Sequence, residues 1–200
     1  MRPTQIRLEE AEKTIREPSF RKNKGRGNEV GYYVFNYPAA DELIVREWVS
    51  HWIRKNNPDI DGFRFNVFDL YDTMIDLLIQ EESLEQCFNM EEEFGLDGIA
   101  EDIGNILGLT NENDSPNPNM IVDYICDHTA ENDIVILSGI GKCYPVLRSH
   151  TVLNVLHQHL DTVPVILLFP GEYDGQELVL FGTVKGGGNN YYRALKLIAY

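Results

Sequence analysis

The stretch from Asn132 to Gly171 constrains the fold more than any other part of the chain. Ile134 to Leu137 is a short run of mostly β-branched residues, and Val163 to Phe169 is continuously apolar. Between these runs, small or apolar residues recur at helical spacing at positions 146, 149, 153, 156 and 160. Two short apolar runs around one helical pattern predict a strand-helix-strand crossover. Because both runs are apolar throughout, we expect helices to cover both faces of their strands.

The other segments fit the same class of fold. Strand patterns, rich in aromatic and β-branched residues, occur at 32–35, 63–68 and 178–182. Helical patterns occur at 4–17, 41–55, two or three times within 69–107, and at 120–128. The strict alternation of 63–68 indicates a strand near a sheet edge, and 191–198 fits a helix or a strand. The short link before 178 favours antiparallel pairing with the 163–169 strand.

These elements predict an α/β fold: a three-layer mixed, mostly parallel sheet with helices on both faces and an antiparallel C-terminal strand. A chain of 200 residues can build one sizeable core. We expect residues 1–30 to form an N-terminal helix, ended by Pro18, and a basic flexible loop over 19–28. Residues 31–200 are expected to form a single α/β domain.

The charge is unevenly distributed along the chain. The net charge is −15, yet residues 1–30 hold 8 Lys and Arg against 5 Asp and Glu. No Lys or Arg occurs between Arg64 and Lys142, an interval that contains 18 acidic residues. This interval either solvates helix surfaces or forms an acidic docking face for a basic protein. Because nucleic-acid affinity comes chiefly from neutralising phosphates, no direct binding of nucleic acid is expected.

Composition also bears on location. No window of 18 consecutive apolar residues occurs and the N-terminus lacks an apolar signal segment, so no membrane association is expected. The three cysteines, Cys87, Cys126 and Cys143, have neither metal-ligand spacing nor an even number for disulfides. A cytoplasmic location is therefore predicted, with no metal and no cofactor.

The loop that follows the 134–137 strand is the first candidate site. Open α/β sheets bind ligands at the carboxyl ends of their strands, and the amides around Gly139 and Gly141 could hold an anion beside Lys142. The spacing matches neither a Walker A loop nor a dinucleotide fingerprint, because Cys143 stands where the magnesium-binding hydroxyl belongs and a third glycine is missing. A tight structural turn is the alternative.

Three further residues near this loop are candidates. Arg148 stands at the start of the predicted helix, where a cation opposes the helix dipole, so a carboxylate or phosphate partner is expected. A partner within the chain fits the many acids best. His150 is a candidate binding residue but has no metal-binding companion at suitable spacing. Cys143 beside Lys142 could have a lowered thiol pKa, but no base for nucleophilic catalysis can be assigned, so no catalytic residue is predicted.

Tyr192 and Arg193, which follow Tyr191, join an aromatic ring to a guanidinium and suit a protein surface or a nucleobase. Tyrosine packing, with Arg193 bridging to the sheet, is the alternative. The basic stretch 21–26 is the one segment that could contact a polyanion such as DNA, and a solvated linker is its other interpretation.

Taken in order, several of these segments resemble the BrxB family, small components of bacteriophage-exclusion (BREX) defence systems. The segments that carry the resemblance are Leu137–Gly141, Tyr144–His150, Pro164–Gly171, Leu180–Gly182 and Tyr191–Ala194. Arg148 and His150 match the family's P-x-x-R-x-H pattern, and Arg193 its Y-Y-R pattern, whereas Lys142 and Cys143 lie outside the pattern. The resemblance implies a role beside a large ATPase, an adenine DNA methyltransferase and the phosphatase-like PglZ protein, which is the expected partner.

Two functions follow as expectations. The first is a non-enzymatic adaptor or regulatory component that binds PglZ, with Gly139, Gly141, Lys142, Arg148, His150, Tyr192 and Arg193 as candidate binding residues. The alternative is a nucleotide- or phosphate-binding protein that uses the loop at Gly139 and Gly141, as a degenerate nucleotide hydrolase would.

Overall fold

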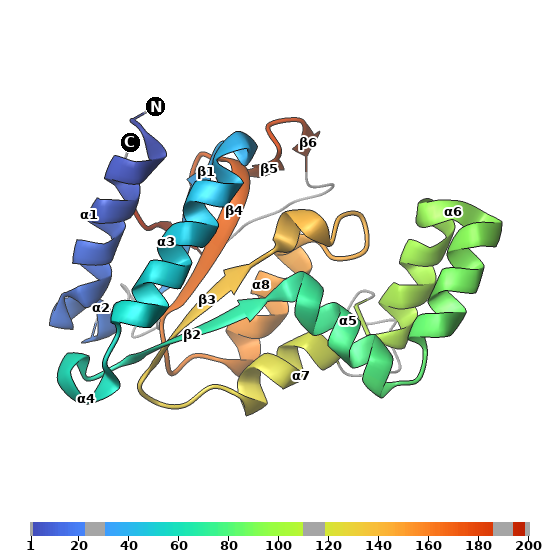
Figure 1. Ribbon diagram of the computed structural model, residues 1–200, viewed down its shortest axis with the longest axis horizontal. Coiled ribbons are helices and arrows are strands. Elements are labelled where there is room, and N and C mark those ends of the chain that lie inside the picture. The colour runs from blue at the N-terminus through green and yellow to red at the C-terminus, as the bar shows by residue number, and fades with distance from the viewer. Residues whose placement is uncertain (1, 23–30, 110–118, 186–193, 199–200) are drawn as a thin grey trace.

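A computed structural model describes residues 2–22, 31–109, 119–185 and 194–198 (Figure 1). The helices are α1 (Thr4–Arg16), α2 (Pro18–Lys22), α3 (Glu42–Lys55), α4 (Pro58–Asp61), α5 (Leu70–Gln80), α6 (Leu84–Ile106), α7 (Met120–Asp127) and α8 (Ser149–His159), with 3-10 turns η1 (Ala39–Asp41) and η2 (Ile140–Lys142). The strands are β1 (Tyr32–Tyr37), β2 (Arg64–Asp69), β3 (Asp133–Ser138), β4 (Val165–Tyr173), β5 (Leu178–Leu180), β6 (Val184–Lys185) and β7 (Leu195–Lys196).

The main sheet has the strand order β2-β3-β4-β1-β7, and every neighbouring pair in it is parallel. β5 pairs antiparallel with the end of β4, and β6 pairs antiparallel with β5. The predicted α/β fold is thereby confirmed, including the crossover from β3 through α8 to β4. The alternating strand β2 lies at an edge of the sheet, as expected. The segment 191–198, open between helix and strand, contributes the short strand β7 beside β1.

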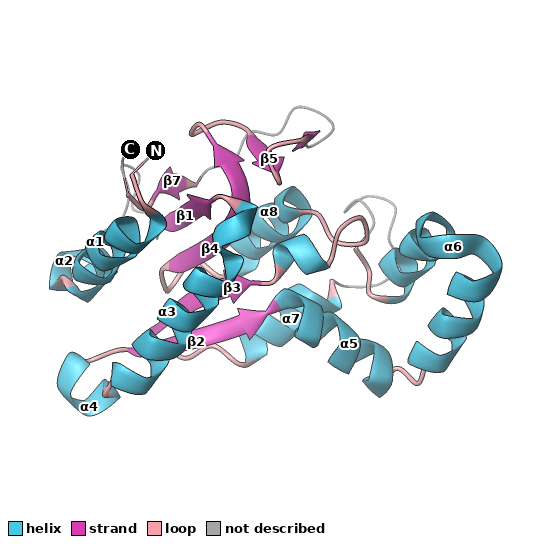
Figure 2. Cartoon of the chain, turned by 45° about the horizontal axis from the view of Figure 1, so that its top comes forward, coloured by secondary structure: helices cyan, strands magenta, loops and turns pink. Residues whose placement is uncertain are grey.

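Side chains on the two faces of the sheet enter two separate cores. On β1, Tyr32 and Val34 face one way, and Tyr33, Phe35 and Tyr37 face the other. Such alternation is the period of a strand. α1 and α3 cover the second face, where Leu8, Ala11, Ile15, Val45, Val49 and Trp52 are buried. The three layers are visible in Figure 2.

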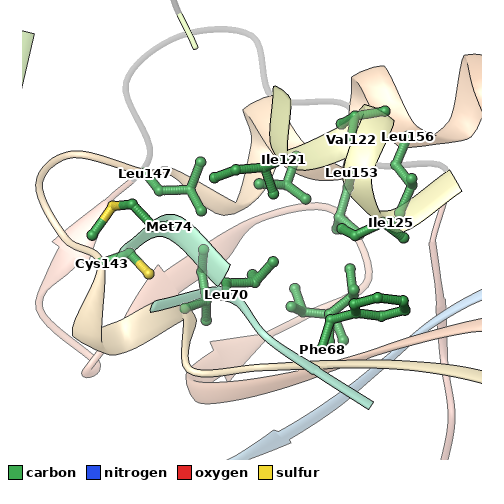
Figure 3. Packing of buried hydrophobic residues seen from close by; sticks show 14 of the residues in the cluster. Phe68, Leu70, Met74, Ile121, Val122, Ile125, Cys143, Leu147, Leu153 and Leu156 are labelled. Carbon is green, nitrogen blue, oxygen red and sulfur yellow. The ribbon is translucent and has the colours of Figure 1, made fainter. Parts of the chain in front are cut away.

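The helices α5, α6, α7 and α8 belong to the other face of the sheet. Figure 3 shows part of this core, in which side chains from α5, α7 and α8 pack above Phe68 of β2. The buried face of α7 consists of Ile121, Val122 and Ile125. The buried face of α8 includes Val152 and Leu156. This core is the larger of the two in the described part of the chain, and it reaches from α6 to β5.

Two local predictions are wrong. Pro18 does not lead into a loop, because it begins α2, and Ser19 to Lys22 are helical. A proline fits the first position of a helix, where its missing N–H would have no partner. The second wrong prediction concerns the start of the crossover helix. Position 146 was included in its helical pattern, but α8 begins at Ser149, so Val146 lies before the helix. The rest of the expected basic loop, 23–28, lies outside the described residues. The proposed division of the chain at residue 30 stays a prediction, although α1 shares a core with α3.

Candidate functional site

The carboxyl ends of β2 and β3 meet at one edge of the sheet and bring two loops together. Asp69 ends β2 and pairs in register with Ser138, which ends β3. The Asp69 carboxylate also accepts hydrogen bonds from the backbone N–H groups of Tyr71 and Asp72 and so caps the N-terminus of α5. The loop that holds η2 therefore lies beside a carboxylate, at the position where open α/β sheets bind ligands.

Lys142 is paired with acids of the chain itself. Its Nζ donates a hydrogen bond to Oδ2 of Asp69 over 2.7 Å and lies 3.5 Å from Oδ1 of Asp72. It also lies 5.1 Å from the centre of the Tyr71 ring, within range of a cation–π contact. Partial burial acts to lower the pKa of the Lys142 ammonium, but the hydrogen bond and charge of Asp69 prevail and raise it. Lys142 thus remains charged and has its partners already.

The two glycines of the loop are explained by close packing. Gly139 has a left-handed backbone with φ of 76°, and a Cβ there would collide with the carboxylate of Asp69. At Gly141, a Cβ would lie 3.0 Å from Pro170 of β4 and 3.0 Å from the ring of Phe181, which follows β5. Two neighbouring segments therefore occupy the space beside the glycines, and these contacts favour the structural interpretation of the loop.

Three backbone N–H groups of this connection are used within the chain. The N–H of Lys142 bonds to the carbonyl of Gly139, and the N–H of Cys143 bonds to the carbonyl of Ile140. The N–H of Leu147 bonds to the carbonyl of Cys143. An anion site at a loop needs backbone N–H groups that point to a common ligand. These three groups point to carbonyls instead.

Cys143 lies inside the core rather than at the surface. Figure 3 shows its side chain close to Leu70 and Met74, and its Sγ lies 3.5 Å from the carbonyl oxygen of Gly139. Burial raises the pKa of the Cys143 thiol to about 12, with a smaller contribution from the charge of Asp69. The lowered pKa considered for this residue is therefore wrong, because burial outweighs the neighbouring Lys142.

Arg148 and His150 lie further along the same connection. Arg148 precedes the first residue of α8, as predicted, and its side chain is exposed. It makes no ion pair with any residue in the described ranges, so the expected carboxylate partner is not found there. His150 is in the first turn of α8, and its side chain is outside the described part. Tyr192 and Arg193 also fall outside it.

Sequence reasoning missed Asp69, which bonds to Lys142 and packs against Gly139. Its position directly after an alternating strand was the available signal, since strand ends in parallel sheets converge. Within the described ranges, no three His, Cys, Asp or Glu side chains are grouped so that they could hold a metal ion. No helix in these ranges is long and apolar enough to cross a membrane.

Most of the acidic interval folds into α5, α6 and α7 on one face of the sheet. Of these, α6 extends to one end of the molecule, away from the strands (Figure 1). Its outer surface carries exposed Phe88, Phe94 and Leu96 among carboxylates. The outer surface of α6 is therefore a second candidate site, in addition to the loop after β3, and it suits a protein partner.

Comparison with known proteins places the chain in a family. The family model "BREX protein BrxB" matches residues 66–197. A BREX protein BrxB from Bacillus cereus (strain H3081.97) is 43% identical over 198 residues, which are 99% of this chain and 99% of the relative. A BREX protein BrxB from Escherichia coli O9:H4 (strain HS) is 31% identical over 196 residues, 97% of this chain and 91% of the relative. No solved structure matches. The identity and coverage of these matches show that the chain belongs to the BrxB family of BREX proteins.

Proposed function

We propose that this protein is a non-enzymatic adaptor of a BREX bacteriophage-exclusion system and that it binds the phosphatase-like PglZ protein of that system. Membership of the BrxB family supports the role in defence. The observation that carries the adaptor role is the packing at the carboxyl ends of β2 and β3, where side chains of the protein itself surround the glycine loop. Lys142 is paired with Asp69, and Phe181 packs against Gly141.

The chemistry of this edge argues against catalysis by its most reactive groups. A cysteine nucleophile needs a thiolate and a positioned base, whereas the thiol of Cys143 is buried and its pKa is about 12. A phosphate-binding lysine must be able to leave its carboxylate partners, and Lys142 has two of them. These features weaken the alternative of a nucleotide- or phosphate-binding protein, and no observation favours it over the adaptor.

An adaptor works through its exposed side chains. Arg148 is exposed and matches the P-x-x-R-x-H pattern of the family, so we assign it to partner binding together with His150 and the Tyr192–Arg193 pair. The large ATPase and the adenine methyltransferase of the system are further candidate partners. The site of action that we propose is the cytoplasm, where the free thiols of Cys87, Cys126 and Cys143 stay reduced.

Co-purification tests this function directly. The tagged chain and PglZ are expressed together, captured through the tag, washed, and then separated by size-exclusion chromatography. We expect both proteins to elute in one peak in constant ratio. Capture of the chain without PglZ, with both proteins folded and present in the extract, would contradict the proposal. Nucleotides are then titrated into the purified chain by calorimetry, and binding of ATP or GTP would favour the alternative function.

A further inference from the structure

The helix α6 projects from the rest of the protein, and only one of its sides packs against the core. Figures 1 and 2 show it beyond α5, at the end of the molecule far from β1 and α1. Gly95, with φ of 70° and ψ of 179°, breaks the helix in its middle and turns the chain. Cys87 before this turn, and Ile99 and Ile103 after it, are buried in the same core. Both halves of α6 are thus anchored, and their other surfaces face solvent.

Large apolar side chains lie on these outer surfaces. Phe88 is 58% exposed, and Phe94 and Leu96, on either side of Gly95, are 59% and 51% exposed. Residues three and four apart in a helix are neighbours on its surface. Phe88 is therefore bordered by Glu85, Glu91 and Glu92, all of them exposed. Phe88 and Phe94 belong to neither hydrophobic core of the described residues, and aromatic side chains are enriched at protein interfaces.

The charge around these side chains has one sign. α6 contains seven acids and no Lys or Arg, and the acids are Glu85, Glu91, Glu92, Glu93, Asp97, Glu101 and Asp102. None of the described carboxylates among them forms an ion pair with a described residue. A single-sign potential on a projecting element attracts a partner of opposite charge and repels one of the same charge. Such a surface disfavours nucleic acid and anionic protein surfaces.

We propose that the outer surface of α6 is the docking surface of this protein, and that it receives a protein surface in which Lys and Arg side chains surround an apolar pocket. The aromatic rings of Phe88 and Phe94 fill the pocket, and the carboxylates around them pair with the cations. This inference rests on the proposed adaptor role and names the surface that performs it. Arg148 then contributes a separate contact, because it lies on the connection between β3 and α8.

Two variants remove the two components of the surface separately. Phe88→Ser/Phe94→Ser removes the apolar anchors, and its matched control is Leu43→Ser/Ile60→Ser, since Leu43 and Ile60 are 75% and 81% exposed on α3 and α4. Glu91→Gln/Glu92→Gln/Glu93→Gln removes three charges from α6. Its control, Glu9→Gln/Glu17→Gln/Glu47→Gln, removes three exposed charges outside α6. Circular dichroism melts check that each variant is folded.

The tagged full chain is expressed together with PglZ, the ATPase and the methyltransferase of its system, and binding is then measured between purified proteins at several salt concentrations. We expect the Phe88→Ser/Phe94→Ser variant to weaken binding about tenfold or more. We expect the α6 glutamine variant to bind more weakly at low salt and with a smaller salt dependence than the wild type. Both control variants should bind as the wild type does.

The outcomes separate this inference from the proposed function. If PglZ binds the wild type and both α6 variants equally, the docking surface is wrong and the adaptor role stands. If PglZ does not bind but the ATPase or the methyltransferase binds through α6, the docking surface stands and the proposed partner is wrong. If no component binds, both are overturned. Light scattering of the chain alone should give the mass of a monomer. If the wild type is instead a dimer and the Phe88→Ser/Phe94→Ser variant is a monomer, the surface of α6 binds a second copy of this chain. That result would overturn the proposal.

Discussion

Nζ of Lys142 lies 2.7 Å from Oδ2 of Asp69 and joins the loop after β3 to the end of β2. The two residues are neighbours because their strands are parallel and adjacent, although 73 positions separate them in the sequence. The pair neutralises the one lysine of the glycine loop. Lys142 stands where a phosphate-binding loop would have its lysine, but here its ion pair with Asp69 connects two segments of the fold.

Replacing Lys142 with Met should have a small effect on stability. The pair is partly exposed, so we expect the free energy of unfolding to fall by about 1 kcal/mol or less. Urea denaturation of the wild type and of Lys142→Met measures this change. Calorimetric titration of ATP with magnesium into both proteins should give no binding heat. Heat in the wild type that disappears in Lys142→Met would show that Lys142 is a ligand for phosphate.

Gly139 and Gly62 allow the cost of backbone strain to be distinguished from the cost of steric collision. Both have a left-handed backbone, with φ of 76° and 71°. A Cβ at Gly139 would collide with the carboxylate of Asp69, whereas the nearest atom to a Cβ at Gly62 is Nη1 of Arg21, at the far end of a flexible side chain. Gly62→Ala should therefore cost about 1 kcal/mol for the left-handed backbone alone. Gly139→Ala should cost about 1–3 kcal/mol more, because Asp69 must move away from the N-terminus of α5. Thermal and urea unfolding measure both values, and equal losses would contradict the close packing at Gly139.

Asp133 is the most fully bonded carboxylate at the other end of the sheet. It accepts hydrogen bonds from Arg64 through both oxygens, at 2.9 and 2.6 Å, and further bonds from Asn66 and the N–H of Ala130. Asp133→Asn should lower the free energy of unfolding at pH 7 by about 1–3 kcal/mol. The exposed neighbour Glu131→Gln, as the control, should change it by less than about 0.5 kcal/mol.

The same residue should make stability depend on acidity. Burial acts to raise the pKa of Asp133, but the bonds from Arg64, Ala130 and Asn66 prevail and lower it. Asp133 therefore stabilises the fold above its unfolded pKa, about 3.9, and this contribution is lost as the pH falls through the lower folded pKa. Urea unfolding in steps from pH 7 to about pH 3 should show the wild type losing more stability than Asp133→Asn. Parallel losses in the two proteins would contradict this role.

Cys143 should resist alkylation in the folded protein. Its thiol is buried and its pKa is raised to about 12, so almost no thiolate exists near neutral pH. Mass spectrometry of peptides after brief treatment with iodoacetamide at about pH 8 should find Cys143 unmodified in the native chain and modified in urea. Rapid native labelling would indicate an accessible, activated thiol and would reopen the case for a nucleophile.

Arg148→Ala should leave the fold intact. The side chain is exposed and pairs with no described residue, so the free energy of unfolding should change by less than about 0.5 kcal/mol. If Arg148 contacts the partner, the same variant should weaken binding of PglZ by about tenfold. Melting curves beside binding curves distinguish the two roles. A large loss of stability would assign Arg148 to the scaffold.

Local periodicity of apolar residues predicted the helices and strands of this fold, but not which side chains of each helix are buried. The crossover β3-α8-β4 and the edge strand β2 follow from runs and alternation of apolar residues. In α3, the helical spacing of Ile44, Trp48, Val49, Trp52 and Ile53 predicts the buried stripe. This prediction is only partly right, because Val45 is buried and Ile53 is exposed. α3 has more apolar positions than one face can bury, so the packing against α1 selects among them.

The site was harder to predict, because its contacts join segments that are distant in the sequence. The loop of Gly139, Gly141 and Lys142 was predicted as a candidate site, but its partner Asp69 comes from β2 and its partner Phe181 from the turn after β5. Only the folded sheet brings them together. The acidic interval could be seen in the sequence. The break at Gly95 and the exposure of Phe88 and Phe94 could not, because they depend on which face of α6 packs against the core.

The most direct test of the account is the mass of a mixture of this protein with purified PglZ. Size-exclusion chromatography with light scattering is run on each protein alone and on the equimolar mixture at micromolar concentration. The adaptor role predicts a new species, with the summed mass of the two proteins, in the absence of nucleotide and metal. Two unchanged peaks at the masses of the separate proteins would contradict it.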